Sequence, residues 1–132
     1  VSGRPVGCYK YAVQDSALTY TSSTFTTISG LDLTITEAGT YRITGYWNWK
    51  SSGQYNQQWF RILKNSTALL SLGSNDSYRW GYYRGYNQYV PESMVHVEYL
   101  SVNDHIYLQV SENNASRVLT VTKSGIYAEK IA

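Results

Sequence analysis

The sequence is poor in several residues on which common classes of protein depend. Among its 132 residues there are one cysteine, two prolines, one methionine and two histidines, and only 15% are charged, against roughly 25% in a typical globular protein. Since Cys8 is the only cysteine, no disulfide can form within one chain, and oligomerisation is one alternative source of stability. No histidine lies near Cys8 in the sequence, so we interpret it as an inert buried thiol rather than a nucleophile.

The charges are few, scattered and nearly balanced. The net charge is +2, and there is no basic block or acidic tail. Because this positive charge is too weak for a phosphate-binding footprint, we predict no nucleic-acid partner. No stretch approaches the roughly 18 apolar residues of a membrane span, and no signal peptide is visible, so we predict no membrane insertion. The start "VSGRPVG" predicts that 1–7 are the end of a linker from an upstream stalk or domain, followed by one domain over 8–132.

The residues that abound are Tyr, Trp, Ser, Thr and the β-branched aliphatics, with 14 Tyr and 4 Trp. This mixture suits the pleated, half-buried surfaces of β-sheets. Alternation of apolar and polar residues recurs along the chain, and no helical period is sustained. The alternation and the intervening turn residues predict strands at 8–14, 23–28, 31–36, 40–50, 58–64, 68–72, 94–100, 105–111, 118–122 and 125–132. The predicted fold class is therefore all-β, a β-sandwich and most simply a jelly roll.

The segment 40–50 indicates which side of a strand faces the core. Its odd positions carry Tyr41, Ile43, Gly45, Trp47 and Trp49. Its even positions are mostly polar, and residues two apart share one face of a strand. The odd face is therefore predicted to be core, and Tyr46 is predicted to lie at an interface or on the surface.

The segment MVHVEYL is partly apolar on both faces of its predicted strand. Val95, Val97 and Tyr99 share one face, while Met94 and Leu100 lie on the other. A sandwich strand with two apolar faces needs a second packing partner, which favours a closed homotrimer over a monomer with scattered surface apolar residues. The candidate trimer-interface residues are Tyr46, Val95, Val97, Tyr99, Tyr107 and Tyr127.

Four motifs, taken in order, resemble one protein superfamily. They are AGTYRITGYW, RILKNST, YLSVNDHIYLQVS and SGIYAEKIA. Their order and spacing over roughly 24–132 resemble the tumour necrosis factor and complement globular-head superfamily, although Asn103 stands where that family usually has Gly. Asn and Gly both tolerate the left-handed conformation, so the turn is expected to survive.

The resemblance implies a ten-stranded jelly roll that assembles as a compact homotrimer. Such heads cap collagen-like or fibrous stalks in animal secreted proteins, in spore coats, in some lectins and at the tips of phage and viral fibres. They bind ligands and are not enzymes. An extracellular or virion-surface location follows from the same resemblance.

The segment 74–89, SNDSYRWGYYRGYNQY, departs from the pattern of its flanking strands. Its rings do not follow a period of two, and Gly81 and Gly85 interrupt regular structure. We therefore predict a long loop or distorted hairpin that presents rings and arginines. Because Tyr, Trp and Arg are typical of interface hot spots and rings also stack on sugars, we predict that it forms a ligand site. The alternative is that the rings fill a trimer interface or cover the sandwich edge. The candidate ligand-binding residues are Tyr78, Arg79, Trp80, Tyr82, Tyr83, Arg84, Tyr86 and Asn87, with Tyr55 from the polar loop 51–57.

Constellations that could support catalysis are scarce. His96 and His105 are the only histidines, and their spacing suggests adjacent positions in a hairpin; we interpret them as surface or interface residues. No nucleophile–base set, phosphate loop or carboxylate pair is placed by the sequence, so we predict no enzyme activity, no metal and no cofactor. The triplets at Asn65, Asn75 and Asn114 are glycosylation sequons in a secreted animal protein and turn chemistry otherwise.

Three functions compete at this point. The first is a receptor-binding head at the tip of a phage or viral fibre, joined to an upstream stalk and recognising a cell-surface glycan or protein. The second is a structural trimerisation head of a collagen-like or spore-surface protein, or a secreted lectin-like domain. The third is a binder of single-stranded nucleic acid through aromatic platforms, against which the weak charge argues.

Overall fold

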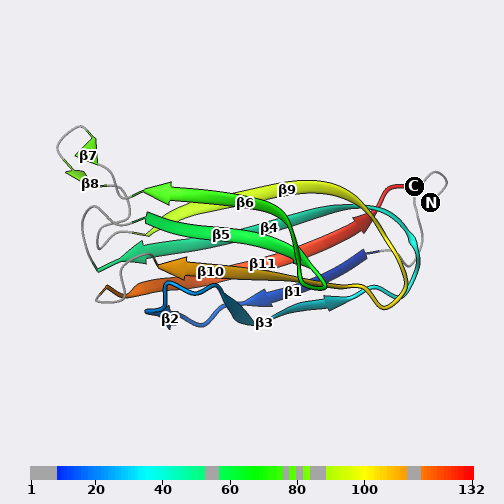
Figure 1. Ribbon diagram of the computed structural model, residues 1–132, viewed down its shortest axis with the longest axis horizontal. Helices are drawn as coiled ribbons and strands as arrows, with labels where there is room; N and C mark the ends of the chain where they lie inside the picture. The colour runs from blue at the N-terminus through cyan, green and yellow to red at the C-terminus, as the bar shows by residue number, and fades with distance from the viewer. Residues whose placement is uncertain (1–8, 53–56, 76–77, 80–81, 84–88, 113–116) are drawn as a thin grey trace.

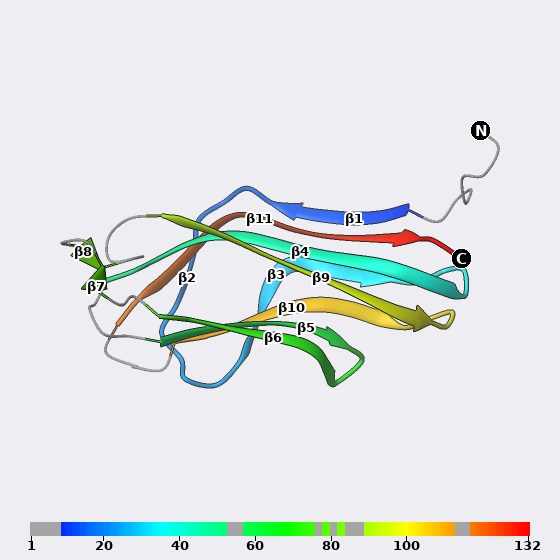
Figure 2. The same ribbon diagram turned by 90° about the horizontal axis from the view of Figure 1, so that it is seen from above.

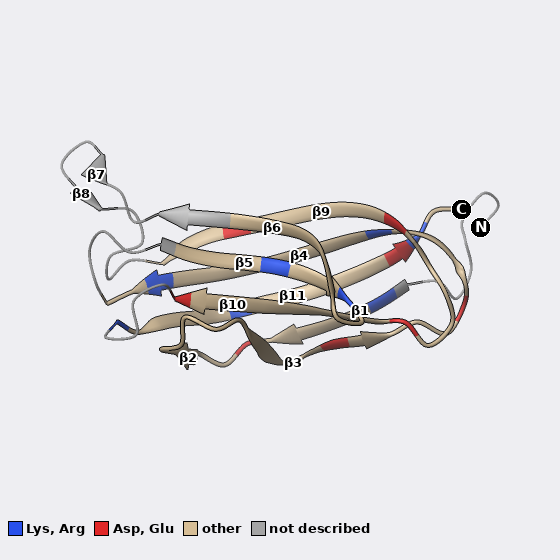
Figure 3. Cartoon of the chain, viewed as in Figure 1, with Lys and Arg blue, Asp and Glu red and all other residues tan. Residues whose placement is uncertain are grey.

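The computed structural model describes residues 9–52, 57–75, 78–79, 82–83, 89–112 and 117–132. The predicted linker end at 1–7 and Cys8 lie outside these ranges. Within them, no helix is long and apolar enough to span a bilayer. Figure 3 shows the charged residues interspersed over both sheets without a block of one sign, as the sequence suggests.

Two antiparallel sheets pack face to face (Figures 1 and 2), which confirms the predicted β-sandwich. The first sheet has the order β1-β11-β4-β9, with β2 also paired to β11, and the second has the order β3-β10-β5-β6. A short separate pair, β7-β8, lies within the segment 74–89. The strands are β1 Tyr9–Gln14, β2 Leu18–Tyr20, β3 Thr26–Thr34, β4 Gly39–Ser51, β5 Gln57–Lys64, β6 Thr67–Asn75, β7 Tyr78–Arg79, β8 Tyr82–Tyr83, β9 Val90–Leu100, β10 His105–Glu112 and β11 Leu119–Lys130.

The last strand differs from its prediction. The sequence suggests two strands joined at a turn near Ser124 and Gly125, but β11 is one strand that pairs with β4 along most of its length. Its register with β4 shifts between Thr122 and Gly125, and Lys123 has a φ of 47°. A β-bulge of this kind adds one residue to a strand without ending it, which is why it resembles a turn in the sequence.

The core lies between the two sheets and is rich in rings. Trp47 and Trp49 from β4 are buried, as predicted, and their ring centroids lie 4.8 and 6.0 Å from that of Phe60 in the opposite sheet. Gly45, on the same face of β4, makes room for Leu108, because a Cβ at position 45 would lie 2.8 Å from a methyl of that side chain. The alternation of β4 therefore encodes both the core rings and the gap between them.

Asn65 joins two turns that are far apart in the sequence. Its Nδ2 donates to Asp104 Oδ1 at 3.0 Å, and its Oδ1 accepts from the backbone N of His105 at 3.0 Å. Its backbone N donates to the carbonyl of His105 at 2.8 Å. Both Asn65 and Asn103 have positive φ, 51° and 72°, as their turns require. Asn65 thus supplies turn chemistry, and its amide is already engaged within the fold.

We expect this junction to make stability depend on pH. Hydrogen bonds from the Asn65 amide and then from the Ser101 backbone N lower the pKa of Asp104 below its ordinary value of 3.8. A lowered folded-state pKa contributes stability above the unfolded-state value, and that stability is lost as the pH falls through the folded-state pKa. The Asp104→Asn variant should therefore be less stable than wild type at pH 7 and closer to it at pH 2. Urea unfolding at one fixed protein concentration measures both differences, and equal differences at the two pH values would contradict the assignment.

The strands run along the molecule, so the two ends of the sandwich differ. β1 begins and the chain ends at one end, while β7 and β8 lie at the opposite end (Figure 1). We call these the terminal end and the loop end. The two described strands of the segment 74–89 therefore lie at the end remote from Ala132.

Candidate functional site

The outer face of the first sheet is apolar along much of its length. Five large apolar residues on β1 and β9 are each 47–61% exposed in the single chain: Tyr11, Val13, Val95, Val97 and Tyr99. Most exposed apolar residues in a folded chain are scattered singly, whereas these lie on one face of two strands in the same sheet. We call them, together with Tyr46 and Tyr127, the Tyr/Val face.

A row of three tyrosines crosses the Tyr/Val face. Tyr127 on β11 stacks on Tyr46 of β4 with ring centroids 5.5 Å apart, and Tyr11 of β1 lies 6.4 Å from Tyr127 on the other side. Tyr46 covers Gly125, where an added Cβ would lie 2.5 Å from its ring atoms. Rigid rings braced in this way present contact area at a low entropy cost.

The structure brings together five of the six residues predicted for the trimer interface. Tyr46, Val95, Val97, Tyr99 and Tyr127 all lie on the Tyr/Val face. Tyr107 lies instead on β10 of the second sheet, and its hydroxyl donates to the carbonyl of Asn65 at 3.1 Å. The sequence reasoning did not single out Tyr11 and Val13, although their alternation in 8–14 placed them on one face of a strand.

The candidate ligand-binding residues fall in the ring-rich segment and one polar loop. Tyr78 and Arg79 form β7, and Tyr82 and Tyr83 form β8, with Tyr78 opposite Tyr83 in the register. The backbone therefore contains a short hairpin, one of the two forms expected for this segment. The remaining candidates, Tyr55, Trp80, Arg84, Tyr86 and Asn87, lie outside the described residues.

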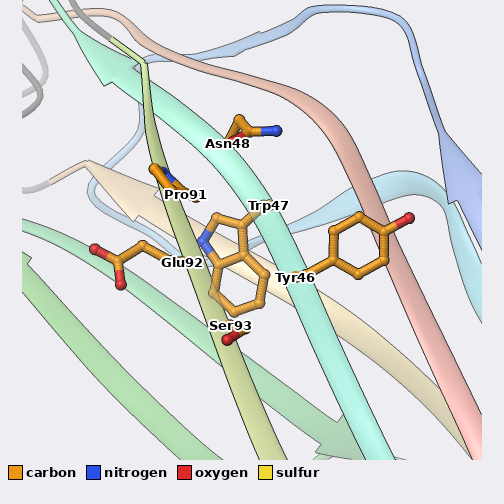
Figure 4. Close-up of a pocket in the computed structure, with 6 residues that line it drawn as sticks. All are labelled: Tyr46, Trp47, Asn48, Pro91, Glu92 and Ser93. Carbon is orange, nitrogen blue, oxygen red and sulfur yellow. The ribbon is translucent and has the colours of Figure 1, made fainter.

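A groove lies along the paired strands β4 and β9, in the part of them that is nearer the loop end (Figure 4). It has a volume of about 520 Å³. Figure 4 shows the ring of Tyr46 reaching from β4 over the neighbouring strand β11. The lining residues are Tyr46, Trp47, Asn48, Pro91, Glu92 and Ser93. The groove continues the first sheet's outer surface from the Tyr/Val face toward β7 and β8.

Buried polar side chains fix the strand ends from which the loops leave. Glu112 at the end of β10 is fully buried, and its Oε2 accepts from Gln58 Nε2 at 3.1 Å and from Ser51 Oγ at 3.3 Å. Ser51 ends β4 in the first sheet, so the carboxylate links both sheets. A hydrogen-bonded group of this kind rigidifies its surroundings, and the scattered carboxylates of the sequence gave no signal of it.

The two histidines do not lie in one hairpin, and that interpretation is wrong. His96 lies on β9 of the first sheet and His105 on β10 of the second, because the turn between these strands crosses from one sheet to the other. His96 Nε2 lies 3.1 Å from Glu98 Oε1, and Lys64 Nζ lies 3.2 Å from the other oxygen of Glu98. The hydrogen bonds from His96 and then Lys64 lower the pKa of Glu98. Among the described residues, no three His, Cys, Asp or Glu side chains are placed to bind a metal ion.

A solved structure shares the arrangement of the sheets. The structure of Eiger TNF from S. frugiperda matches with a TM-score of 0.62, covering 95% of this chain and 94% of its own, at 12% sequence identity. The chain has a tumour necrosis factor-like fold. The resemblance inferred from the four motifs is thereby confirmed at the level of the fold. No protein-family profile matches the sequence, and no curated protein does so either.

Proposed function

We propose that this TNF-like chain is a non-enzymatic, trimeric receptor-binding head at the tip of a phage or viral fibre. It is carried on an upstream fibrous stalk outside the cell or on the virion surface. It recognises a cell-surface glycan or protein through its aromatic loops. The observation that carries the proposal is that the Tyr/Val face runs along the first sheet, while β7 and β8, which belong to the ring-rich sequence 74–89, lie at the loop end.

The Tyr/Val face supports self-association. Its rings of Tyr11, Tyr127 and Tyr46 form one row, and its exposed valines lie on the two outer strands β1 and β9 of the same sheet. Exposed apolar surface of this kind marks an interaction surface. The ion pair between Arg42 and Glu129, with Nη2 and Oε2 3.0 Å apart, lies on the same sheet face and would supply polar contacts at such an interface. Closed symmetry buries the same patch on every copy and leaves none exposed.

The loop end supports recognition. β1 begins and β11 ends at the terminal end, so a stalk joined there would lie at the end of the sandwich opposite β7 and β8 (Figure 1). Tyr, Trp and Arg are enriched at binding hot spots, and loops held on a rigid scaffold are where binding residues concentrate. A fibre tip needs this arrangement, with assembly along the shaft and contact at the far end.

Cell binding by ring-deleted variants tests the recognition part of the proposal. Trp80→Ala and Tyr83→Ala should each weaken binding to the target cells by about tenfold or more, the loss typical of a hot-spot residue. Flow cytometry with the labelled head measures this, and an unchanged melting temperature shows that the variants remain folded. Folded variants that bind as well as wild type would remove the loop from the site. A wild-type head that binds no cell or glycan would favour the structural trimerisation role instead.

A further inference from the structure

Lys123 has an unusual backbone conformation for a lysine. It sits at the bulge in β11 with a φ of 47°, and it is exposed. Positive φ is uncommon outside glycine, asparagine and aspartate, and it persists only when the surrounding structure imposes it. Bulges re-aim side chains and are over-represented beside functional sites.

Lys123 borders a concavity next to the groove of Figure 4. The two share Asn48. This second cavity, which we call the Lys123 pocket, has a volume of about 430 Å³ and is lined by Asn48, Tyr89, Thr122 and Lys123. Volumes of 300–1,000 Å³ are typical of small-molecule sites. The pocket joins β4 and β11 to Tyr89, the last residue of the segment 74–89.

Among the described residues, the lining of the pocket has the positive charge of Lys123 and no carboxylate. Lys50 Nζ lies 4.8 Å from the centroid of the Tyr89 ring. Within the described part of the chain, neither Lys50 nor Lys123 forms an ion pair. Lys64 and Lys130, by contrast, each contact a glutamate, at 3.2 and 2.8 Å. Two ammonium groups to which the described residues offer no counter-ion favour an anionic ligand.

The other lining groups suit a sugar. The Asn48 amide makes no hydrogen bond within the described residues and offers both a donor and an acceptor. Thr122 Oγ1 donates to the carbonyl of Asp15 at 3.1 Å, which leaves its lone pairs to accept from a hydroxyl. The Tyr89 ring is 45% exposed, and a ring face stacks on the apolar face of a saccharide.

We propose that the Lys123 pocket binds a carboxylate-bearing monosaccharide unit of a surface glycan, with Lys123 and Lys50 holding the carboxylate. The inference rests on the proposed receptor-binding function and narrows its ligand to acidic sugars. Asn48 and Thr122 bind the hydroxyl groups, and Tyr89 packs against the ring. A cavity of about 430 Å³ exceeds what an isolated carboxylate fills, which favours a sugar over a free anion or a single acidic side chain.

The strand register keeps the pocket apart from the Tyr/Val face. Tyr127 and Val95 both pair with Thr44 of β4, and Asn48 pairs with Thr122 on one side and Pro91 on the other. The pocket is therefore displaced along β4 toward the loop end, beyond Tyr46. A trimer packed through the Tyr/Val face leaves this part of the sheet near the loop end for a ligand.

Titration of the full chain with small probes tests the pocket directly. N-acetylneuraminic acid and glucuronic acid should perturb the backbone amide NMR signals of Asn48, Tyr89 and Lys123 saturably, and the affinity should fall as salt is added. Galactose should bind at least about fivefold more weakly, the size expected for loss of a half-exposed ion pair. Titrations with acetate and sulfate show whether small free anions bind the pocket as well as the sugar acids do.

Charge-removing variants give the second arm of the test. Lys123→Asn keeps a residue that tolerates positive φ, and Lys50→Gln leaves the strand unchanged. Each should weaken binding of the sugar acids by about fivefold, while Lys10→Gln on β1 makes the same charge change at a distance and should leave binding unaltered. Melting temperatures confirm that each variant folds.

Several results would overturn the proposal. They are no saturable binding of either sugar acid, equal binding of acetate or sulfate, and Lys123→Asn or Lys50→Gln variants that bind like wild type. Cell binding separates this proposal from the function on which it rests. A head that attaches to cells through Trp80 yet binds no sugar acid keeps its function and loses this ligand. A head that binds the sugar acids but no cell keeps the pocket and loses the receptor role.

Discussion

Replacing Val95 by glutamate should convert the head from a trimer into a monomer. The wild type should have a solution mass of three times 15.0 kDa, about 45 kDa, and the variant a mass near 15.0 kDa. Val95 is 54% exposed at the middle of the Tyr/Val face and pairs with Thr44. An interface formed there would bury the new carboxylate without a partner, which costs several kcal/mol per copy.

The choice of position and control sharpens this experiment. Val97 is equally exposed, but it pairs with Arg42, whose guanidinium would neutralise a glutamate beside it. Ser71→Glu places the same charge on the exposed side of β6 in the second sheet and should leave the trimer intact. Multi-angle light scattering measures the mass of all three proteins. A wild type of 15.0 kDa, or a Val95→Glu variant that stays trimeric, would remove the Tyr/Val face as the assembly surface.

Replacing Trp47 by alanine should destabilise the fold by about 3–5 kcal/mol, the range for deleting a buried Trp ring. Trp47 is 1% exposed, and it packs on Phe60 across the sandwich at a centroid distance of 4.8 Å. The variant leaves a cavity between the two sheets. Because β4 is hydrogen-bonded to a neighbouring strand on each side, it can move only partly into this cavity.

Two further variants identify the source of that loss. Trp47 Nε1 is buried and makes no hydrogen bond within the described residues, so Trp47→Phe should cost much less, since it removes an unsatisfied donor along with part of the ring. Ser71→Ala, on the exposed side of β6 in the second sheet, should change stability by no more than about 0.5 kcal/mol. Urea unfolding at one protein concentration measures all three. A Trp47→Ala variant within about 1 kcal/mol of wild type would show that this ring does not hold the sheets together.

The period of two in the sequence was sufficient to predict the faces of the central strands. It placed Tyr41, Trp47 and Trp49 in the core and Val95 and Val97 on the opposite side of the sheet, and all five lie there. The alternation succeeds because side chains of a strand point to opposite faces whatever the strand pairs with. The turn at Asn103 was also predicted, for a local reason: an Asn side chain tolerates the positive φ of this turn.

Features that depend on pairing across the sandwich could not be predicted. In β1 the large residues Tyr11 and Val13 point outward, while Ala12 packs against the core, so residue size alone gives the wrong face. The chain crosses from one sheet to the other between β9 and β10, which separates His96 from His105. In the sequence this crossing looks like a hairpin, because it is as short as a hairpin turn.

The candidate site was predictable in composition but not in geometry. The segment 74–89 was recognisable from its many rings and its two arginines. The Lys123 pocket, by contrast, depends on a bulge that no residue pattern predicted. Lys50, Lys123 and Tyr89 come from three separate segments, and they meet because β4 pairs with β11 on one side and with β9 on the other.

The direction of the strands also has a mechanical consequence. A head that grips a surface at the loop end and is tethered at the terminal end is pulled along the length of its strands (Figure 2). Ladder hydrogen bonds of antiparallel strands lie perpendicular to the strands, so such a tension shears them together rather than unzipping them singly. β1, the strand next to the tether, is joined to β11 by six register pairs from Tyr9 to Gln14, all of which must yield before the first strand leaves the sheet.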